Sequence, residues 1–330
     1  MVFSGTMTSR DRLMAAMRGE QVDRYPVWLK SVGRYWREAQ PGRFDNVDGT
    51  TLQELSGCDV MTSNGAEIVS ERPRVTITTK LTETEWVWHC ETPDGPLHRV
   101  DRIDAESGSG HPSEYAIKSL DDVRRMRWVY EDTKHALDES TVPDAVEKQA
   151  EWELTGRAST MGGMSSTPFL EMMQELAGPE MTIYMLHDDP EPVEELFAAL
   201  HADRMRELAA MLACPAYDSF WVTENTSTTL FSPAMFEKYC MGPLADYANA
   251  INAAGVISVY HMCGKLSALL GMIETLPVNV IEAYTTSPVG NVSLAQGRTE
   301  MPSKCLIGGT NAALWLRPAE EIIAEVAADV

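Results

Sequence analysis

Short apolar runs alternate with longer amphipathic segments over the second half of the chain, from about residue 150 onward. Short apolar runs are typical of buried strands, and apolar residues spaced three or four apart are typical of helices. The runs predict strands at 152–156, 219–223, 256–260, 278–283 and 306–308. The segments between them predict helices at 168–176, 190–211, 233–253, 265–275 and 318–330.

The N-terminal part of the chain adds a helix and two strands to this pattern. The helix is predicted at 8–17, with Thr8 or Ser9 as its N-cap. The strands are predicted at 22–29 and 59–62. Repeated strand–helix units form a parallel sheet. Seven or eight such units in about 300 residues predict an α/β fold, a (β/α)8 barrel of the TIM type.

Residues 72–118 follow a different pattern. Apolar and polar side chains alternate at 75–79 and 85–90, and Pro93-Asp-Gly-Pro96 predicts a turn between strands. Alternation with period two, interrupted by tight turns, indicates an antiparallel β-meander. We therefore expect one domain over 1–330, with the meander as an insertion.

The chain is acidic: 27 Lys and Arg stand against 49 Asp and Glu among 330 residues, a net charge of -22. Such a charge disfavours nucleic acid and anionic membrane as partners. No apolar stretch approaches the roughly 20 residues that span a bilayer, and the first residues lack a secretory signal pattern. Six scattered cysteines are typical of reduced thiols. We expect a cytoplasmic protein, and its oligomeric state, a homodimer included, stays open.

The strand predicted at 256–260 runs into His261-Met-Cys263-Gly264. Side chains two apart on a strand lie on one face, so His261 and Cys263 can reach one ion. An imidazole with a soft thiolate suits zinc better than a hard cation. The alternative is a strand end packed in a core, because two ligands do not complete a tetrahedral site.

Other polar residues also follow predicted strands, where active groups of such barrels gather. Glu224 and Asn225 are candidates for substrate or proton handling, or for capping a turn. Arg34 could bind a ligand carboxylate or phosphate, or pair with an acid nearby. Asn64 could contact substrate or satisfy a turn beside Gly65. The substrate-binding candidates are Lys30, Arg34, Asn64 and Asn311.

Several motifs together resemble the uroporphyrinogen decarboxylase superfamily. The opening segment 10–28 resembles the start of that superfamily, and Pro26-Val-Trp-Leu-Lys-Ser-Val-Gly-Arg-Tyr35 is similar to its substrate-binding loop. Pro168-Phe, Asp189-Pro-Glu and the His-Met-Cys-Gly motif follow in the superfamily's order. The resemblance covers nearly the whole chain and implies a (β/α)8 barrel with an N-terminal helical extension.

One branch of this superfamily consists of metal-free decarboxylases. They hold tetrapyrrole carboxylates with arginines in the loop after the first strand and use an aspartate after the second. Lys30 stands at the first arginine position, Arg34 remains, and Asn64 stands at the aspartate position. Without that carboxylate the pyrrole cation lacks its stabilising group, which argues against decarboxylation.

The other branch consists of zinc methyltransferases that act with corrinoids, including those of O-demethylation. They carry His-x-Cys as His261-Met-Cys263 does, and a related zinc site takes a Glu from the next strand, as Glu282 would supply. The branch's last ligand is a Cys in the eighth strand. The chain stops at Val330, after the seventh strand, so we expect that unit to be absent. Cys305 is a poor substitute, since it begins its strand at the far end.

The resemblance implies a zinc-dependent methyltransferase. It would move a methyl group between a corrinoid of the cobalamin type and a small thiol, folate or methoxylated substrate. A corrinoid protein is the expected partner, because the chain has no Asp-x-His-x-x-Gly cobalamin motif. Two alternatives stay open, a metal-free uroporphyrinogen-type decarboxylase and a non-catalytic barrel that binds metal or ligand. The methyl donor or acceptor and the direction of transfer also stay open.

Overall fold

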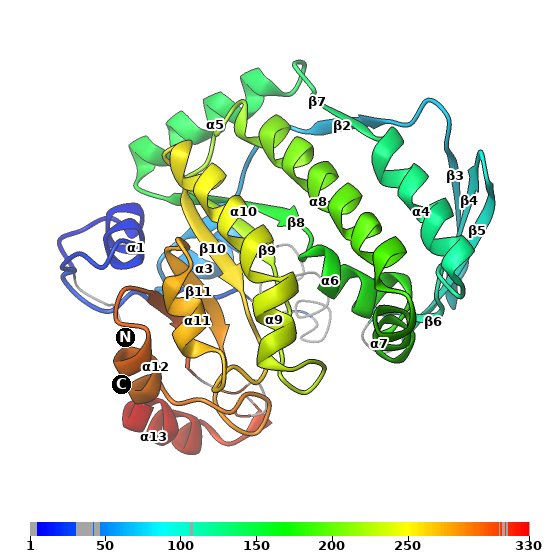
Figure 1. Cartoon of the computed structure of the whole chain (residues 1–330). Coiled ribbons are helices and arrows are strands. Elements are labelled where there is room, and N and C mark those ends of the chain that lie inside the picture. Colours follow the sequence, from blue (N-terminus) through cyan, green and yellow to red (C-terminus); the bar gives the residue numbers. More distant parts are fainter. Residues whose placement is uncertain are drawn as a thin grey trace.

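The computed structural model describes residues 5–30, 42, 47–105, 108–309, 311, 314 and 316–329. Its centre is a curled, six-stranded parallel sheet (Figure 1). Every pair of neighbouring strands in it is parallel. In order across the sheet the strands are β1 (Met61–Ser63), β8 (Ala158–Met164), β9 (Ser219–Thr223), β10 (Ile257–His261), β11 (Val280–Tyr284) and β12 (Cys305–Gly308). Together they make half of a barrel wall.

Helices that alternate with these strands cover the convex face of the sheet (Figure 1). The largest apolar cluster of the described chain lies between these two layers. The helices that follow residue 140 are α5 (Val142–Thr155), α6 (Pro168–Glu171), the π-helix η1 (Met172–Leu176), α7 (Pro179–Asp188), α8 (Pro190–Leu212), α9 (Pro233–Tyr239), α10 (Met241–Ala253), α11 (Leu270–Thr275), α12 (Leu294–Glu300) and α13 (Ala319–Asp329).

The concave face of the sheet has a smaller apolar cluster of its own. Met61, Trp221 and Val259 contribute to it from three strands, and helix α1 (Ser9–Met17) adds Leu13 and Met14. Thr8 caps α1, since its side chain accepts a hydrogen bond from the Asp11 amide, as expected. The N-terminal helix therefore closes part of the concave face.

Two predicted strands are wrong. Residues 152–156 belong to the end of α5, which Gly156 terminates at a φ of 72°, and the strand begins only at Ala158. That strand, β8, contains Gly162 and Gly163 and no Val or Ile, so its β signal is weak. Residues 22–29 lie beside β1, where Trp28 Nε1 donates to the Met61 carbonyl, but form no regular strand. The strands predicted near 59, 219, 256, 278 and 306 are confirmed within two residues of their bounds.

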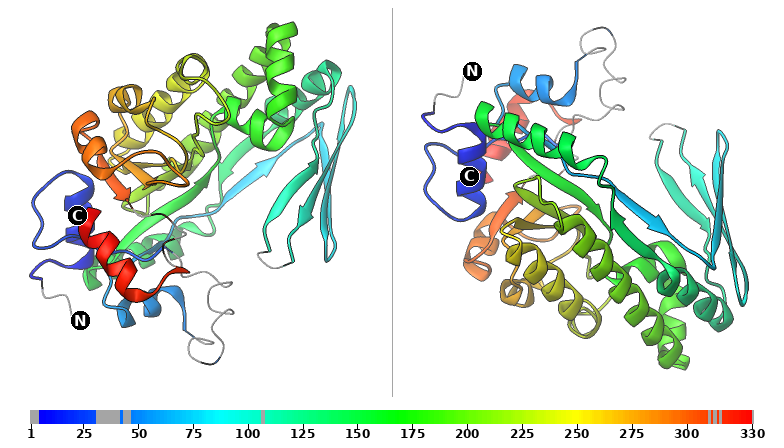
Figure 2. Two further views of the ribbon diagram at one scale, coloured as in Figure 1. Left: turned by 90° about the horizontal axis from the view of Figure 1, so that it is seen from below. Right: turned by 90° about the horizontal axis from the view of Figure 1, so that it is seen from above.

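The segment with period-two alternation forms a separate antiparallel sheet at one side of the molecule (Figure 2). Its strands are β3 (Thr76–Leu81), β4 (Glu85–Thr92), β5 (Gly95–Ile103) and β6 (Gly110–Glu114). Helix α4 (Leu120–Asp132) packs on this sheet, and the ribbon β2 (Ile68–Glu71) with β7 (Lys134–Leu137) joins it to the main sheet. Helix α3 (Gly49–Leu55) precedes β1. No helix in the described ranges is both long and apolar enough to cross a membrane.

Candidate functional site

Strand register brings three polar side chains to one level of the concave face. His261 at the end of β10 pairs with Thr223 of β9 on one side and with Glu282 of β11 on the other. One layer below, Val259 pairs with Trp221 and Val280. Because side chains two apart share a face, the polar layer lies directly above an apolar one.

His261, Glu282 and Lys30 form one hydrogen-bonded group. His261 Nδ1 contacts Glu282 Oε2, and Lys30 Nζ donates to both carboxylate oxygens of Glu282 at 3.0 Å. Lys30 Nζ also lies 3.4 Å from His261 Nδ1 and 4.8 Å from the centre of the Trp221 ring. Glu282 is 5% exposed. The buried carboxylate therefore holds a cation at the carboxyl end of the sheet.

The charges in this group shift the pKa values of both partners. Burial opposes the charge on His261, but hydrogen bonds to Cys263 and Glu282 outweigh it and raise the His261 pKa to about 9. Burial also opposes the charge on Glu282, but His261 and Lys30 outweigh it and lower the Glu282 pKa. We conclude that Glu282 is an anion at neutral pH in this arrangement.

Cys263 lies next to this group and contacts a different strand end. Its Sγ is 3.5 Å from Asn225 Oδ1. Asn225 is held in turn by Gln174, whose Nε2 donates to the Asn225 carbonyl at 3.2 Å. Gln174 belongs to the π-helix η1, a type of irregularity that often occurs at functional sites. The thiol is thus positioned by a contact that joins η1 to the sheet.

The donor types of His261, Cys263 and Glu282 fit zinc. The imidazole ends β10, the thiol follows two residues later, and the carboxylate comes from the middle of the adjacent β11; His261 contacts both other groups. Within the described ranges, however, no three His, Cys, Asp or Glu side chains are already spaced as a metal cluster. Lys30 holds the carboxylate instead. Ligation by all three would require Lys30 to leave Glu282.

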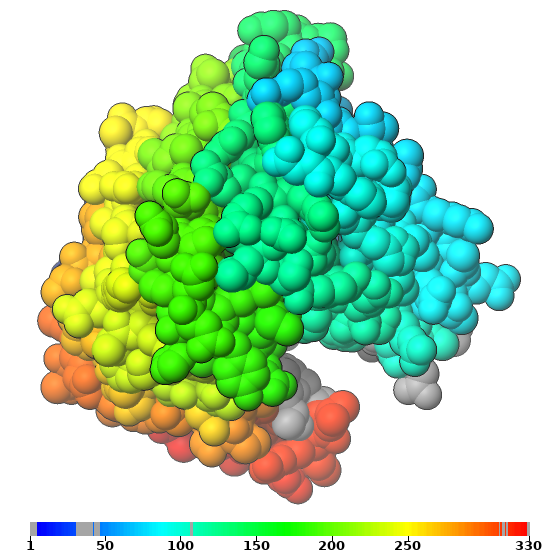
Figure 3. All heavy atoms as spheres, turned by 45° about the vertical axis from the view of Figure 1, so that its right-hand side comes forward, coloured from blue at the N-terminus to red at the C-terminus, as the bar shows by residue number. Residues whose placement is uncertain are grey.

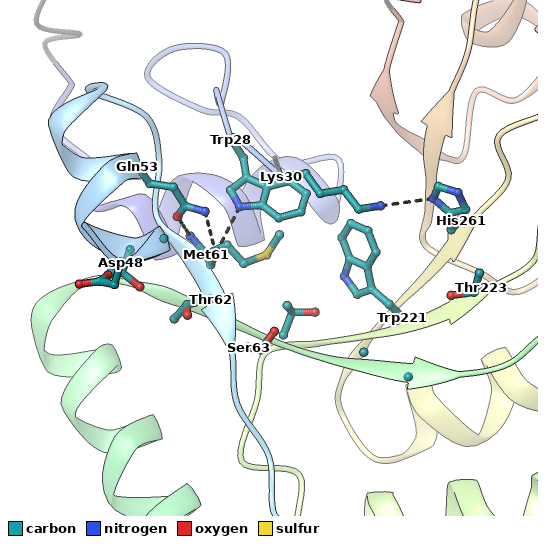
Figure 4. Close-up of a pocket in the computed structure, with 15 residues that line it drawn as sticks. Trp28, Lys30, Asp48, Gln53, Met61, Thr62, Ser63, Trp221, Thr223 and His261 are labelled. Carbon is teal, nitrogen blue, oxygen red and sulfur yellow. Dashed lines mark hydrogen bonds between the residues drawn. The ribbon is translucent and has the colours of Figure 1, made fainter. Parts of the chain in front are cut away.

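A cavity of about 620 Å³ opens beside this group (Figure 4). His261 and Lys30 lie at one end of it. Figure 3 shows that the molecular surface is also hollowed between the antiparallel sheet and the C-terminal segment, neither of which lines this cavity. Trp28 and Trp221 meet edge to face, with ring centres 5.4 Å apart. The other lining residues are Asp48, Gly49, Thr50, Gln53, Met61, Thr62, Ser63, Thr160, Gly162, Gly163 and Thr223. The cavity combines indole rings and hydroxyl groups with the charged side chains of Lys30, His261 and Asp48.

The extended segment before Lys30 is fixed by a buried carboxylate. Asp59 is fully buried; it accepts from the Val27 amide at 2.9 Å and pairs with Arg24 and Arg12. Gln53 Nε2 then donates to the Leu29 carbonyl at 3.1 Å. These contacts place Lys30 at the cavity although its segment forms no strand.

Glu224 does not face this cavity, contrary to its expected role in substrate or proton handling. Alternation along β9 turns Trp221 and Thr223 to the concave face and Glu224 to the helix layer. Glu224 is fully buried, and its two oxygens accept from the amide and hydroxyl of Thr167 at 2.7 and 2.8 Å. Burial raises its pKa to about 7. Its amide bonds the His261 carbonyl at 3.0 Å, so it supports the site from behind.

The other candidates have separate outcomes. Asn64 is buried, and its side-chain amide donates to the carbonyls of Ala145 and Ala216. Its role is therefore structural, and the predicted contact with substrate is not observed. Asn311 is buried and bonds the Thr286 carbonyl outside the cavity. Cys305 pairs with Val280, in the layer below His261, and burial raises its pKa to about 11. Arg34 lies outside the described residues.

Sequence reasoning missed several cavity residues. Trp28 and Trp221 stand inside apolar runs, where a side chain on the concave face looks like any core residue. Gly162 and Gly163 line the cavity from β8. The spacing of Trp221, Thr223 and Asn225 at i, i+2 and i+4 was the available signal, since it puts all three on one face.

Comparison with known proteins agrees with this fold. The model of the family Uroporphyrinogen decarboxylase (URO-D) matches residues 102–329, more than half of the chain. A solved methyltransferase from Methanosarcina mazei is similar in fold, with a TM-score of 0.56 and 18% identity over 97% of this chain and 88% of that chain. No curated protein matches the chain. On the strength of the family match, the chain belongs to the uroporphyrinogen decarboxylase family.

Proposed function

We propose that this protein is a zinc-dependent methyltransferase built on a (β/α)8 barrel. It moves a methyl group between a corrinoid carried by a partner protein and a small thiol, folate or methoxylated substrate. The observation that carries the proposal is the contact of His261 with both Glu282 and Cys263 at the carboxyl ends of adjacent strands. The fold similarity to a methyltransferase from Methanosarcina mazei supports it.

His261, Cys263 and Glu282 are the residues that would hold zinc. When bound, zinc lowers the pKa of a substrate thiol or polarises a substrate ether, and three protein ligands leave a position open for it. The lowered pKa of Glu282 suits ligation, because a ligand must be deprotonated. In a transfer to a thiol, the sulfur–carbon bond forms, the cobalt–carbon bond breaks with its electron pair left on cobalt, and the thiol proton leaves.

The cavity supplies binding and orientation for this reaction. The indoles of Trp28 and Trp221 cover apolar parts of a substrate and exclude water, which strengthens the polar contacts inside. Thr62, Thr160 and Thr223 offer hydroxyl groups along the same cavity. Its volume of about 620 Å³ fits a small molecule, so the larger corrinoid approaches from outside with its carrier.

The test is methyl transfer from methylcobalamin, followed by the loss of the methyl–cobalt absorbance. Coenzyme M and tetrahydrofolate serve as acceptors, and methoxylated aromatics with cob(I)alamin test the reverse direction. We expect turnover with one of these substrates. Chelation and the substitution Cys263→Ala should each abolish it. Cys214→Ala should keep it, because the Cys214 thiol packs in a separate small cluster. Turnover that survives chelation and Cys263→Ala would contradict the proposal.

A metal-free decarboxylase is the second candidate. It is favoured by the contact of Lys30 with Glu282, which places a cation at the cavity without a metal. Uroporphyrinogen turnover in the presence of a chelator would support this candidate. Zinc bound without any of these activities would instead favour a non-catalytic binding protein.

A further inference from the structure

A second cavity, of about 220 Å³, lies between the antiparallel sheet, helix α4 and the end of η1. It shares no lining residue with the larger cavity beside His261. Two arginines, Arg72 and Arg99, and three large aromatic side chains, Trp86, Trp88 and Tyr130, line it. The cavity thus combines positive charge with aromatic walls in a protein whose net charge is -22.

Among the described residues, Arg72 has no partner for its charge. Its guanidinium forms no ion pair or hydrogen bond with the part of the chain that the structure describes, and its Nε is buried without a partner. Arg74, two residues later, is different: it bonds Asp132 at 2.8 Å and stacks over Trp128 at 4.4 Å. A buried donor without an acceptor costs free energy, so the Arg72 side chain is prepared for an acceptor from outside.

Arg99 does not compete for such an acceptor. It donates to Asp101 at 2.7 Å and also contacts the side chain and carbonyl of Glu175. Asp101 is 1% exposed, so this pair belongs to the wall of the cavity. Asp101 and Glu175 are therefore already paired with Arg99, and Arg72 is the arginine of the cavity wall that has no ion pair with the described residues.

The remaining walls suit a flat apolar group. Trp86 and Trp88 are two apart on β4, so both indoles lie on the face that looks toward α4. Trp86 is 42% exposed and lies at the opening, whereas Tyr130 is buried at the inner side. The volume is below the 300–1,000 Å³ or so of pockets for drug-sized ligands. It therefore admits a ligand with about one ring.

We propose that this cavity binds a small planar carboxylate, a single aromatic ring that bears one carboxyl group. Arg72 takes the carboxylate, since a guanidinium offers paired donors that match its two oxygens. The ring lies against Trp86 and Trp88, and aromatic pairs add to the burial of apolar area. This site is independent of the proposed methyl transfer, so either proposal can fail without affecting the other.

The test is calorimetric titration of the full chain with benzoate, and with benzamide as its neutral counterpart. We expect one benzoate per chain with a Kd of about 0.1–1 mM, and benzamide about tenfold weaker. Arg72→Met should weaken benzoate at least about tenfold, and Trp86→Ala by a smaller factor. The matched control Arg74→Met keeps the affinity, because Arg74 does not line the cavity.

Lys30→Met separates this site from the larger cavity, which Lys30 lines. We expect it to leave benzoate binding unchanged. Arg72→Met is expected to keep the circular dichroism and thermal midpoint of the wild type, since Arg72 makes no ion pair to lose. Absence of benzoate binding, wild-type affinity in Arg72→Met, or loss of binding in Lys30→Met would each overturn the proposal.

Discussion

Glu224 and Glu282 are both buried glutamates, one just after β9 and the other in β11, the two strands that flank β10. Their side chains point to opposite faces of the sheet. Glu282 faces the concave side and contacts Lys30 and His261, which outweigh its burial and lower its pKa. Glu224 faces the helix layer, its carboxylate accepts hydrogen bonds from Thr167, and burial raises its pKa to about 7. One carboxyl is an anion beside a cavity, and the other is near its titration point inside the core.

The difference teaches that position after a strand does not by itself make a site. The period of two along each strand decides which side chain reaches the concave face. Nearby cations then lower the pKa of a carboxyl group and keep it ionised, as metal ligation requires. By both criteria the chemistry belongs to the Glu282 side of the sheet, and Glu224 supports it from behind through its main-chain amide.

The largest expected effect separates the two carboxyls by activity. Glu282→Gln removes the proposed anionic ligand, and we expect kcat/KM for methyl transfer to fall by at least about 100-fold. Glu224→Gln should change it by less than about threefold, because that side chain touches neither cavity nor substrate. The measurement is the methylcobalamin assay on both variants. Equal losses in both would break the comparison.

The next effect concerns the pH dependence of stability. An acid whose pKa is raised by folding destabilises the folded state once it ionises. The contribution of Glu224 to the unfolding free energy therefore falls as pH rises from about 4.5 toward 7. Glu224→Gln lacks this titration. We therefore compare the unfolding free energy of Glu224→Gln with that of wild type at each pH. This difference should shift in favour of the variant by about 2–3 kcal/mol from about pH 5 to pH 8. Urea unfolding at both pH values measures this, and a pH-independent difference would contradict it.

A smaller effect is expected at Lys30. Since Lys30 occupies the Glu282 carboxylate, a bound zinc ion must displace it. Lys30→Met should therefore bind zinc about tenfold more tightly, as measured by competition with a chromophoric chelator. Lys238→Met is the control, because its ion pair with Glu194 lies on the outer helices. Weaker zinc binding in Lys30→Met would show that Lys30 supports the metal site.

The smallest effect tests how Glu224 is held. Thr167→Val keeps the shape of the side chain but removes the hydroxyl that donates to Glu224 at 2.8 Å. We expect a loss of about 1 kcal/mol in unfolding free energy and a further rise of the Glu224 pKa. Thr223→Val, on the concave face, should leave that pKa unchanged. An unchanged Glu224 titration in Thr167→Val would contradict this contact.

Much of the parallel sheet could be predicted from the sequence, because β9 to β12 are apolar runs between helical patterns. Strand β8 could not, since its glycines and lack of Val and Ile hide the strand while the register with β1 and β9 fixes it. The segment before Lys30 is held by Asp59, a contact across 32 residues that no local pattern records. Tertiary hydrogen bonds thus decided both cases.

Within the site, strand spacing predicted that His261 and Cys263 share a face, whereas Glu282 was expected from the resemblance to a related zinc site. The roles of Asn64 and Glu224 could not be predicted in this way, because distant partners fix them: Asn64 donates to two main-chain carbonyls, and Glu224 accepts from Thr167. The second cavity gave no sequence signal either. Arg72 and Arg74 look alike in the sequence, and only the position of Asp132 distinguishes them.

The central claim is that His261, Cys263 and Glu282 hold zinc. Elemental analysis of freshly purified wild type, Cys263→Ala and Cys214→Ala tests it most directly. We predict about one zinc per chain in wild type and Cys214→Ala, and almost none in Cys263→Ala. Wild type without zinc, or Cys263→Ala with the same zinc content as wild type, would contradict the claim.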